Sequence, residues 1–207
     1  MTTSASIAFF DRQFRQQLAG QDFQLNPFEL AALPHLRGHV LDYGCGLGNL
    51  ALAAAAQGCT VTAMDASPAA IAALRDRAGS AALPVEAIEA DLRDYPIAGE
   101  FDAVVAIGLL MFFDCATADR VLARLQERVR PGGIAAINTL IEGTTWLEVF
   151  RNDAHCLFAG DELGRRFAGW DLLHSEFRDF PAPGNTLKSF VTLVARKPLA
   201  TENQPPD

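Results

Sequence analysis

Three glycines alternate with other residues at positions 44, 46 and 48, and an aspartate, Asp42, stands two positions before the first of them. An apolar run that predicts a strand comes before the glycines, and a helix-forming segment follows them. Glycine allows a tight turn and lets a ligand lie against bare backbone. The pattern D-x-G-x-G-x-G therefore predicts a small-molecule binding loop at the carboxyl end of a strand.

The carboxylate beside the loop distinguishes between two classes of cofactor. Dinucleotides place a pyrophosphate on G-x-G-x-x-G, and the last glycine of that pattern would fall at Asn49. Asp42 would repel a diphosphate, whereas its charge suits an ammonium or sulfonium group. A second acid, Asp65, ends the next predicted strand. The loop therefore favours S-adenosylmethionine over NAD(P).

The elements that must position these residues alternate between short β-rich runs and helical windows, which predicts a parallel sheet covered on both faces. The last two runs, 171–180 and 186–196, are joined by too short a link for a crossover and should pair antiparallel. We therefore expect an α/β fold with a doubly wound, mostly parallel, seven-stranded Rossmann-like sheet that ends in an antiparallel hairpin. The five parallel strands are expected at 39–44, 59–65, 85–91, 101–108 and 134–140.

A single domain is expected over residues 1–198, because no repeat or linker divides the chain. Its expected parts are a helical cap, a cofactor-binding core, a substrate-side insert and a terminal hairpin. They occupy residues 1–36, 38–140, 141–170 and 171–197. The polar, proline-rich segment 199–207 is expected to be disordered.

Four motifs resemble those of class I S-adenosylmethionine-dependent methyltransferases: Leu41–Gly48, Asp65, Asp91-Leu92 and Pro131–Gly133. A closer likeness is to the tellurite-resistance-type methyltransferases. It rests on segments 99–102, 110–113, 158–163, 167–170 and 193–197, and the resemblance covers roughly residues 38–197. It implies a methyltransferase of the EC 2.1.1 type with S-adenosyl-L-methionine as cofactor and S-adenosyl-L-homocysteine as product.

The resemblance also implies roles for single residues around the cofactor. The methionine moiety would be lined by Gly44, Cys45 and Gly46, with Asp42 near its amino group. Asp65 would hold the ribose hydroxyls, since a carboxylate accepts two O–H bonds. The remaining cofactor contacts would come from Ala66 beside the adenine or ribose, Asp91 and Leu92 at the adenine edge, and Ile107 opposite the methyl group.

Methyl transfer from a sulfonium is an in-line displacement that depends mainly on proximity and alignment. A general base is needed only when the nucleophile arrives protonated. His155 is the candidate for such acid–base work, and Phe10, Arg12 and Arg151 are the candidates for substrate contacts. We predict no metal site, because no Cys/His cluster has metal-ligand spacing.

The last hairpin departs from the tellurite-resistance pattern, because the loop is shortened and the segment around it is acidic and aromatic, with Arg178 as its only cation. We therefore expect a small-molecule acceptor and leave its identity open. Two alternatives remain open. One is an NAD(P)-dependent oxidoreductase on the same architecture, and the other is a non-catalytic protein that binds an adenosyl ligand.

The charge balance bears on partners. The 207 residues hold 17 Lys and Arg against 25 Asp and Glu, a net charge of −8. This acidity argues against nucleic acid and anionic membranes as partners.

Four cysteines without C-x-x-C pairs, and no recognisable targeting or membrane-spanning run, indicate reduced thiols in a cytoplasmic protein. No pattern indicates an oligomeric state.

Overall fold

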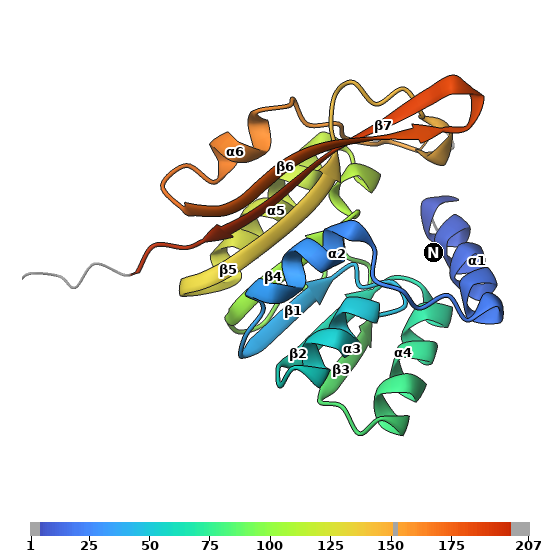
Figure 1. Ribbon diagram of the computed structural model, residues 1–207, viewed down its shortest axis with the longest axis vertical. Coiled ribbons are helices and arrows are strands. Elements are labelled where there is room, and N and C mark those ends of the chain that lie inside the picture. The colour runs from blue at the N-terminus through green and yellow to red at the C-terminus, as the bar shows by residue number, and fades with distance from the viewer. Residues whose placement is uncertain (1–4, 151–152, 200–207) are drawn as a thin grey trace, which may run out of the picture.

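The computed structural model describes residues 5–150 and 153–199, and it places all the strands in one seven-stranded sheet in the order β3-β2-β1-β4-β5-β7-β6 (Figure 1). The neighbours from β3 to β5 run parallel, and β7 pairs antiparallel with both β5 and β6. This confirms the predicted fold class. The strands are β1 His39–Tyr43, β2 Thr60–Asp65, β3 Val85–Glu89, β4 Phe101–Ile107, β5 Val129–Leu140, β6 Asp171–Ala182 and β7 Thr186–Arg196.

Strand β5 begins five residues earlier than the sequence predicts. The sequence predicts this strand at 134–140, but Pro131–Gly133 also belong to β5. The backbone groups of the two glycines are paired with Lys197: Gly132 N donates to Lys197 O at 3.0 Å, and Lys197 N donates to Gly133 O at 2.8 Å. Lys197, which follows β7, therefore continues the sheet alongside Gly132 and Gly133, two residues whose types are typical of a turn.

The helices are α1 Ala5–Gly20, α2 Pro27–Ala32, α3 Asn49–Ala56, α4 Pro68–Ser80, α5 Cys115–Arg128 and α6 Glu162–Arg166. Short 3-10 turns lie at Leu33–His35, Leu110–Phe112, Glu148–Phe150 and Pro183–Asn185. None of the helices in the described ranges is both long and apolar enough to cross a bilayer.

The N-terminal helical segment is divided in two. The turn at Gln21 has a positive φ of 52°, and α2 starts afresh from a capping box. In that box the Asn26 side chain accepts from the backbone of Phe28 and Glu29, while the Glu29 side chain accepts from Asn26 N. Glu29 is thereby fixed in the first turn of α2.

Two apolar clusters cover the two faces of the sheet, because successive strand residues point to opposite sides. On one side Leu41, Val104 and Ala106 pack with α5 and α6. On the other side Val40 and Val105 pack with α3 and α4. Strands β1 and β4 are therefore buried on both faces, as a strand in the middle of a parallel sheet should be.

The chain reverses its winding between β1 and β4, which are adjacent although β2 and β3 intervene in sequence. In open α/β sheets ligands bind at the carboxyl ends of the strands beside such a switch point. The glycine loop follows β1 at this position, and α1 lies across the same end of the sheet (Figure 1).

Candidate functional site

A cavity of about 730 Å³ opens where β1, β2 and β4 end. It is within the usual size range of small-ligand pockets. Its wall contains all the residues predicted to hold the cofactor, together with the predicted substrate residue Phe10. These are Phe10, Asp42, Gly44, Cys45, Gly46, Asp65, Ala66, Asp91, Leu92 and Ile107. The fold thus brings together residues that are far apart in the sequence.

The glycine loop adopts the left-handed conformation at alternate residues, with φ of 86° at Gly44 and 51° at Gly46. Side chains rarely tolerate this region, so the loop needs glycine there. A Cβ on Gly46 would lie 3.0 Å from the Phe14 ring of α1. The loop is fastened to β2, because Gly44 N and Cys45 N both donate to Met64 O, at 2.8 and 2.9 Å.

Asp65 joins the loop to the start of α4. One carboxylate oxygen accepts from Gly46 N at 2.8 Å, and the other accepts from Ser67 N at 2.8 Å. Burial raises the pKa of Asp65, and the backbone N–H donors oppose that rise. Each carboxylate oxygen has a second lone pair, so Asp65 retains the capacity to accept from a ligand hydroxyl.

Asp42 is the most unusual group in the cavity wall. It is only 4% exposed, and its Oδ2 has no hydrogen-bond partner in the described part of the chain. Burial, followed by the negative charges of Glu29 and Asp65, raises the pKa of Asp42 to about 8. A hydrogen bond from the Ala51 backbone opposes this rise. A cation that donates a hydrogen bond here would supply the missing partner and neutralise the charge.

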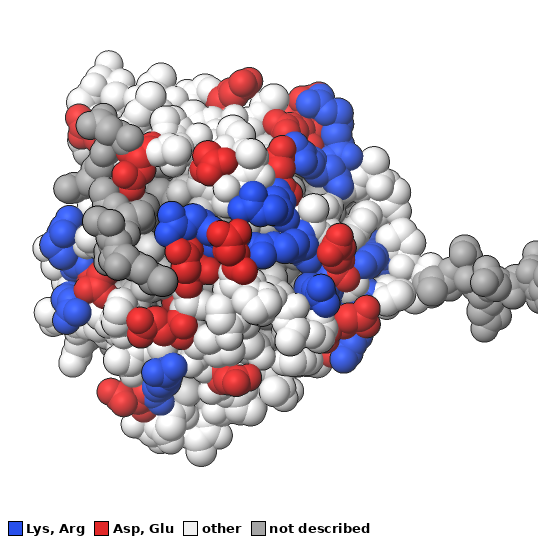
Figure 2. Space-filling view, turned by 180° about the vertical axis from the view of Figure 1, so that it is seen from behind, with Lys and Arg blue, Asp and Glu red and all other residues white. Residues whose placement is uncertain are grey.

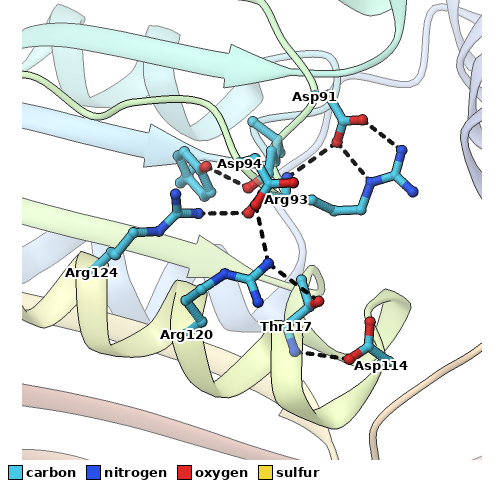
Figure 3. Close-up of polar contacts among 9 residues, drawn as sticks. Asp91, Arg93, Asp94, Asp114, Thr117, Arg120 and Arg124 are labelled. Carbon is cyan, nitrogen blue, oxygen red and sulfur yellow. Dashed lines mark hydrogen bonds and ion pairs between the residues drawn. The ribbon is translucent and has the colours of Figure 1, made fainter. Parts of the chain in front are cut away.

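Asp91 lies at the cavity rim and is paired with Arg93, as Figure 3 shows. The Arg93 side chain donates to both carboxylate oxygens, from Nε at 2.9 Å and from an Nη at 2.5 Å. This pairing lowers the pKa of Asp91. A ligand amino group at Asp91 would share the carboxylate with Arg93. Its neighbour Leu92 is buried, and its carbonyl accepts from the Tyr43 hydroxyl at 2.6 Å.

Helix α1 closes one side of the cavity. The Asp11 carboxylate accepts from the Ser67 hydroxyl at 2.7 Å and from Ala69 N at 3.1 Å, at the N-terminus of α4. Phe10 packs edge-on against Phe112, with ring centroids 4.8 Å apart. Asp11 was not among the residues predicted from the sequence, because its partners lie more than fifty positions away.

Two of the other predicted residues, Arg12 and His155, are not part of the cavity wall. Arg12 is exposed on α1 and is not part of the wall, and Arg151 lies outside the described residues. The His155 ring stacks on Phe150, with centroids 4.2 Å apart and planes 6° apart, and it is also not part of the wall. Asp153 and Ala154, from the same segment, do reach the cavity.

The prediction of four reduced cysteines is wrong for two of them. Cys115, at the start of α5, forms a disulfide with Cys156 of the insert, whereas Cys45 and Cys59 are free and buried. The two partners are 41 positions apart, so no local spacing indicated the pair. The disulfide joins two segments that contribute to the cavity wall, since Asp114, next to Cys115, and Ala154, two residues before Cys156, both line the cavity.

Charged side chains of both signs lie beside one another on the face shown in Figure 2. Ion pairs in the described ranges include Arg120 with Asp94 and Arg166 with Glu162.

Among the described residues, no group of three or more His, Cys, Asp or Glu side chains could hold a metal ion.

Residues 40–133 match a family model described as a methyltransferase domain. This match, over a little under half of the chain, makes the chain similar to methyltransferase domains. The matched segment runs from β1 to the start of β5 and includes the glycine loop, Asp65 and Asp91.

Relatives of the domain include hemagglutinin 1 of Eikenella corrodens, which is 30% identical over 164 residues, or 76% of this chain and 54% of that protein. The chain spans about half or less of the length of the curated relatives that it matches first.

Solved structures with the same fold include TehB from Haemophilus influenzae, at a TM-score of 0.75 and 21% identity over 87% of this chain and 65% of that one. The N-methyltransferase NodS of Bradyrhizobium japonicum WM9, solved with S-adenosyl-L-homocysteine, has a TM-score of 0.67 and 18% identity, covering 91% of this chain and 98% of that one. The likeness of this chain to TehB and to NodS is therefore one of fold, and residues 40–133 carry the sequence likeness to methyltransferase domains.

Replacing Asp42 should change how stability depends on pH. Between an unfolded pKa of about 4 and the folded pKa of about 8, the folded protein binds one more proton than the unfolded chain. The unfolding free energy should therefore fall through this window by about 1.4 kcal/mol per pH unit from this group. Ligand-free Asp42→Asn should lack that fall and be more stable than the wild type at pH 9, as measured by urea unfolding at pH 5, 7 and 9.

The matched control is Asp76→Asn, which removes an exposed carboxylate from α4. Asp76→Asn should follow the wild-type pH profile. Parallel profiles for Asp42→Asn and the wild type would show that Asp42 does not have the raised pKa described above.

The disulfide can be tested by counting thiols. The denatured, unreduced protein should contain two titratable thiols, those of Cys45 and Cys59. The variant Cys115→Ala/Cys156→Ala should lose up to about 4 kcal/mol of unfolding free energy, on the loop-closure estimate for a 41-residue separation. A dithiol reductant should destabilise the wild type and leave this variant unchanged. Four titratable thiols in the wild type would contradict the pairing.

Proposed function

We propose that this protein is an S-adenosylmethionine-dependent methyltransferase that acts on a small-molecule acceptor. The observation that carries the proposal is buried Asp42, which is among the residues that line the cavity beside the glycine loop and whose Oδ2 lacks a partner among the described residues. A cationic amino acid moiety suits that position, because an ammonium would donate to the orphaned oxygen. NodS, which shares the fold, binds S-adenosyl-L-homocysteine.

The other wall residues fit the remaining parts of the cofactor. Asp65 would accept from the ribose hydroxyls with the lone pairs that the loop does not use. Gly44, Cys45 and Gly46 would lie against the methionine chain, where the positive φ of the two glycines presents backbone instead of side chains. Ala66 would border the adenine or the ribose, Asp91 and Leu92 would border the adenine, and Ile107 at the end of β4 would face the methyl group.

When bound, the cofactor supplies a methyl group on a positively charged sulfur. The chain must then hold the acceptor in line with that methyl group and exclude water, which can contribute up to ~7–11 kcal/mol through proximity and orientation. Helix α1 is suited to this covering role. Asp11 fastens it to α4, and its aromatic side chains Phe10 and Phe14 line the cavity.

S-adenosyl-L-homocysteine should raise the melting temperature of the protein, because it binds the folded state preferentially. Asp65→Asn should weaken its affinity at least tenfold, since the variant loses a charged acceptor. The matched control is Glu89→Gln, at the position that pairs with Asp65 on the adjacent strand, where the side chain is exposed and outside the cavity. This variant should bind like the wild type. The measurements are differential scanning fluorimetry and isothermal titration calorimetry.

Two outcomes would contradict the proposed function. Stabilisation by NADH without stabilisation by S-adenosyl-L-homocysteine would favour the oxidoreductase alternative. Binding of S-adenosyl-L-homocysteine, without transfer of a labelled methyl group to any member of a broad panel of amines, thiols, phenols and oxyanions, would favour a non-catalytic binding protein.

A further inference from the structure

The cavity holds more negative charge than the cofactor would use. Asp42, Asp65 and Asp91 would meet the ammonium, the ribose and the adenine. Further carboxylates line the remaining wall, from Asp22, Glu29 and Asp114. Among the described lining residues there is one guanidinium, that of Arg93, and it is hydrogen-bonded to both oxygens of Asp91. An anionic acceptor would therefore approach mainly like charges.

Aromatic rings form the apolar part of the same wall. Phe10 and Phe14 come from α1, and Phe112 and Phe113 come from the segment after β4. The Phe10 ring lies 4.8 Å from that of Phe112 and 5.9 Å from that of Phe14, centroid to centroid. Aromatic faces attract organic cations, and their bulk accommodates an apolar body. Carboxylates and aromatic rings together are the groups that recognise an organic ammonium.

Glu29 is the carboxylate best placed to meet such a group. The capping box holds its Oε2, which accepts from Asn26 N at 2.7 Å, and so fixes the direction of the side chain. Its Oε1 has no hydrogen-bond partner among the described residues, and the residue lines the cavity. Glu29 also lies within electrostatic range of Asp42, where the ammonium of the cofactor is proposed to bind. The side chain is therefore held at the cavity with one oxygen available.

We propose, building on the methyltransferase function above, that the methyl acceptor is an organic amine with an apolar body, and that Glu29 is the carboxylate that binds its nitrogen. The aromatic wall takes the apolar body of the acceptor. The tellurite and selenite oxyanions are excluded as substrates, because the wall would repel them.

The reaction balances with the groups named. An acceptor that arrives as an ammonium first transfers a proton to the Glu29 carboxylate, which frees the nitrogen lone pair. That lone pair then forms the bond to the methyl carbon while the bond from carbon to sulfur breaks, and its electron pair remains on sulfur. The products are a methylated ammonium, S-adenosyl-L-homocysteine and a protonated Glu29, which then gives its proton to water. Burial raises the pKa of Glu29, which favours its holding the proton.

The test measures binding of charge-matched probes to the complex of the wild-type protein with S-adenosyl-L-homocysteine. The pairs are benzylamine with benzoate and phenethylamine with phenylacetate, and tellurite and selenite are tested alongside. The amines should bind at least tenfold more tightly than the matching acids, and neither oxyanion should bind. In turnover assays with labelled S-adenosylmethionine, amines should accept the methyl group.

Glu29→Gln separates the role in acceptor binding from a structural one. Glutamine keeps the capping box, so the variant should fold. We expect its affinity for the amine probes to fall at least tenfold, with its affinity for S-adenosyl-L-homocysteine within twofold of the wild type. The control Glu127→Gln, an equal charge change on an exposed α5 position outside the cavity, should leave both unchanged.

The possible outcomes distinguish this inference from the proposed function. Tighter binding or faster methylation of the acids or oxyanions, or unchanged amine affinity in Glu29→Gln, would overturn the amine assignment and leave the methyltransferase function standing. A loss of S-adenosyl-L-homocysteine binding in Glu29→Gln would place Glu29 at the cofactor and also overturn the assignment. Failure of the wild type to bind S-adenosyl-L-homocysteine would overturn the proposed function itself.

Discussion

A carboxylate that is buried without a full set of partners is the constraint on which the rest of this site depends. Asp42 lies near the end of β1, in the centre of a sheet covered on both faces, so that water cannot solvate its charge. Its pKa rises to about 8 for that reason. A protein under selection for stability alone would have little reason to keep such a group. A ligand that brings a positive charge to Oδ2 turns the same group into a strong binding contact.

The neighbouring elements are arranged so that they could hold a ligand against the Asp42 carboxylate. The glycine loop leaves bare backbone beside Asp42, and Asp65 fixes the loop by accepting from Gly46 N. Asp11 then fastens α1 over the opening through Ser67 and Ala69. The cavity is therefore bordered by the ends of the strands and by α1, and carboxylates from several elements line it.

Most of the fold and the cofactor half of the site could be predicted because their signals are local. The D-x-G-x-G-x-G loop, the acid at the end of β2 and the alternation of strands and helices can each be read within a few residues. The start of β5 could not be predicted, because Gly132 and Gly133 read as a turn until Lys197 pairs with them. The Cys115–Cys156 disulfide and the contact of Asp11 with Ser67 depend on tertiary proximity between distant segments.

The residues that would contact the methyl acceptor were the least predictable part of the site, because they too depend on contacts between distant segments. His155 and Arg12 are candidates by residue type alone. The His155 ring stacks on Phe150, away from the cavity, and Arg12 lies on an exposed side of α1. Glu29 reads in the sequence as a residue of a capping box. Only the packing of α2 against a face of the sheet brings Glu29 to the cavity wall.

The central claim is that a cation replaces a proton at Asp42 when the ligand binds. Calorimetric titration of S-adenosyl-L-homocysteine at pH 7, in buffers of different ionisation enthalpy, measures the protons exchanged on binding. A group with a pKa of about 8 is mostly protonated at that pH, so the account predicts release of about 0.9 proton per ligand, which Asp42→Asn should abolish. Tight binding without proton release, or equal proton release from the wild type and Asp42→Asn, would contradict the replacement of a proton by a cation at Asp42.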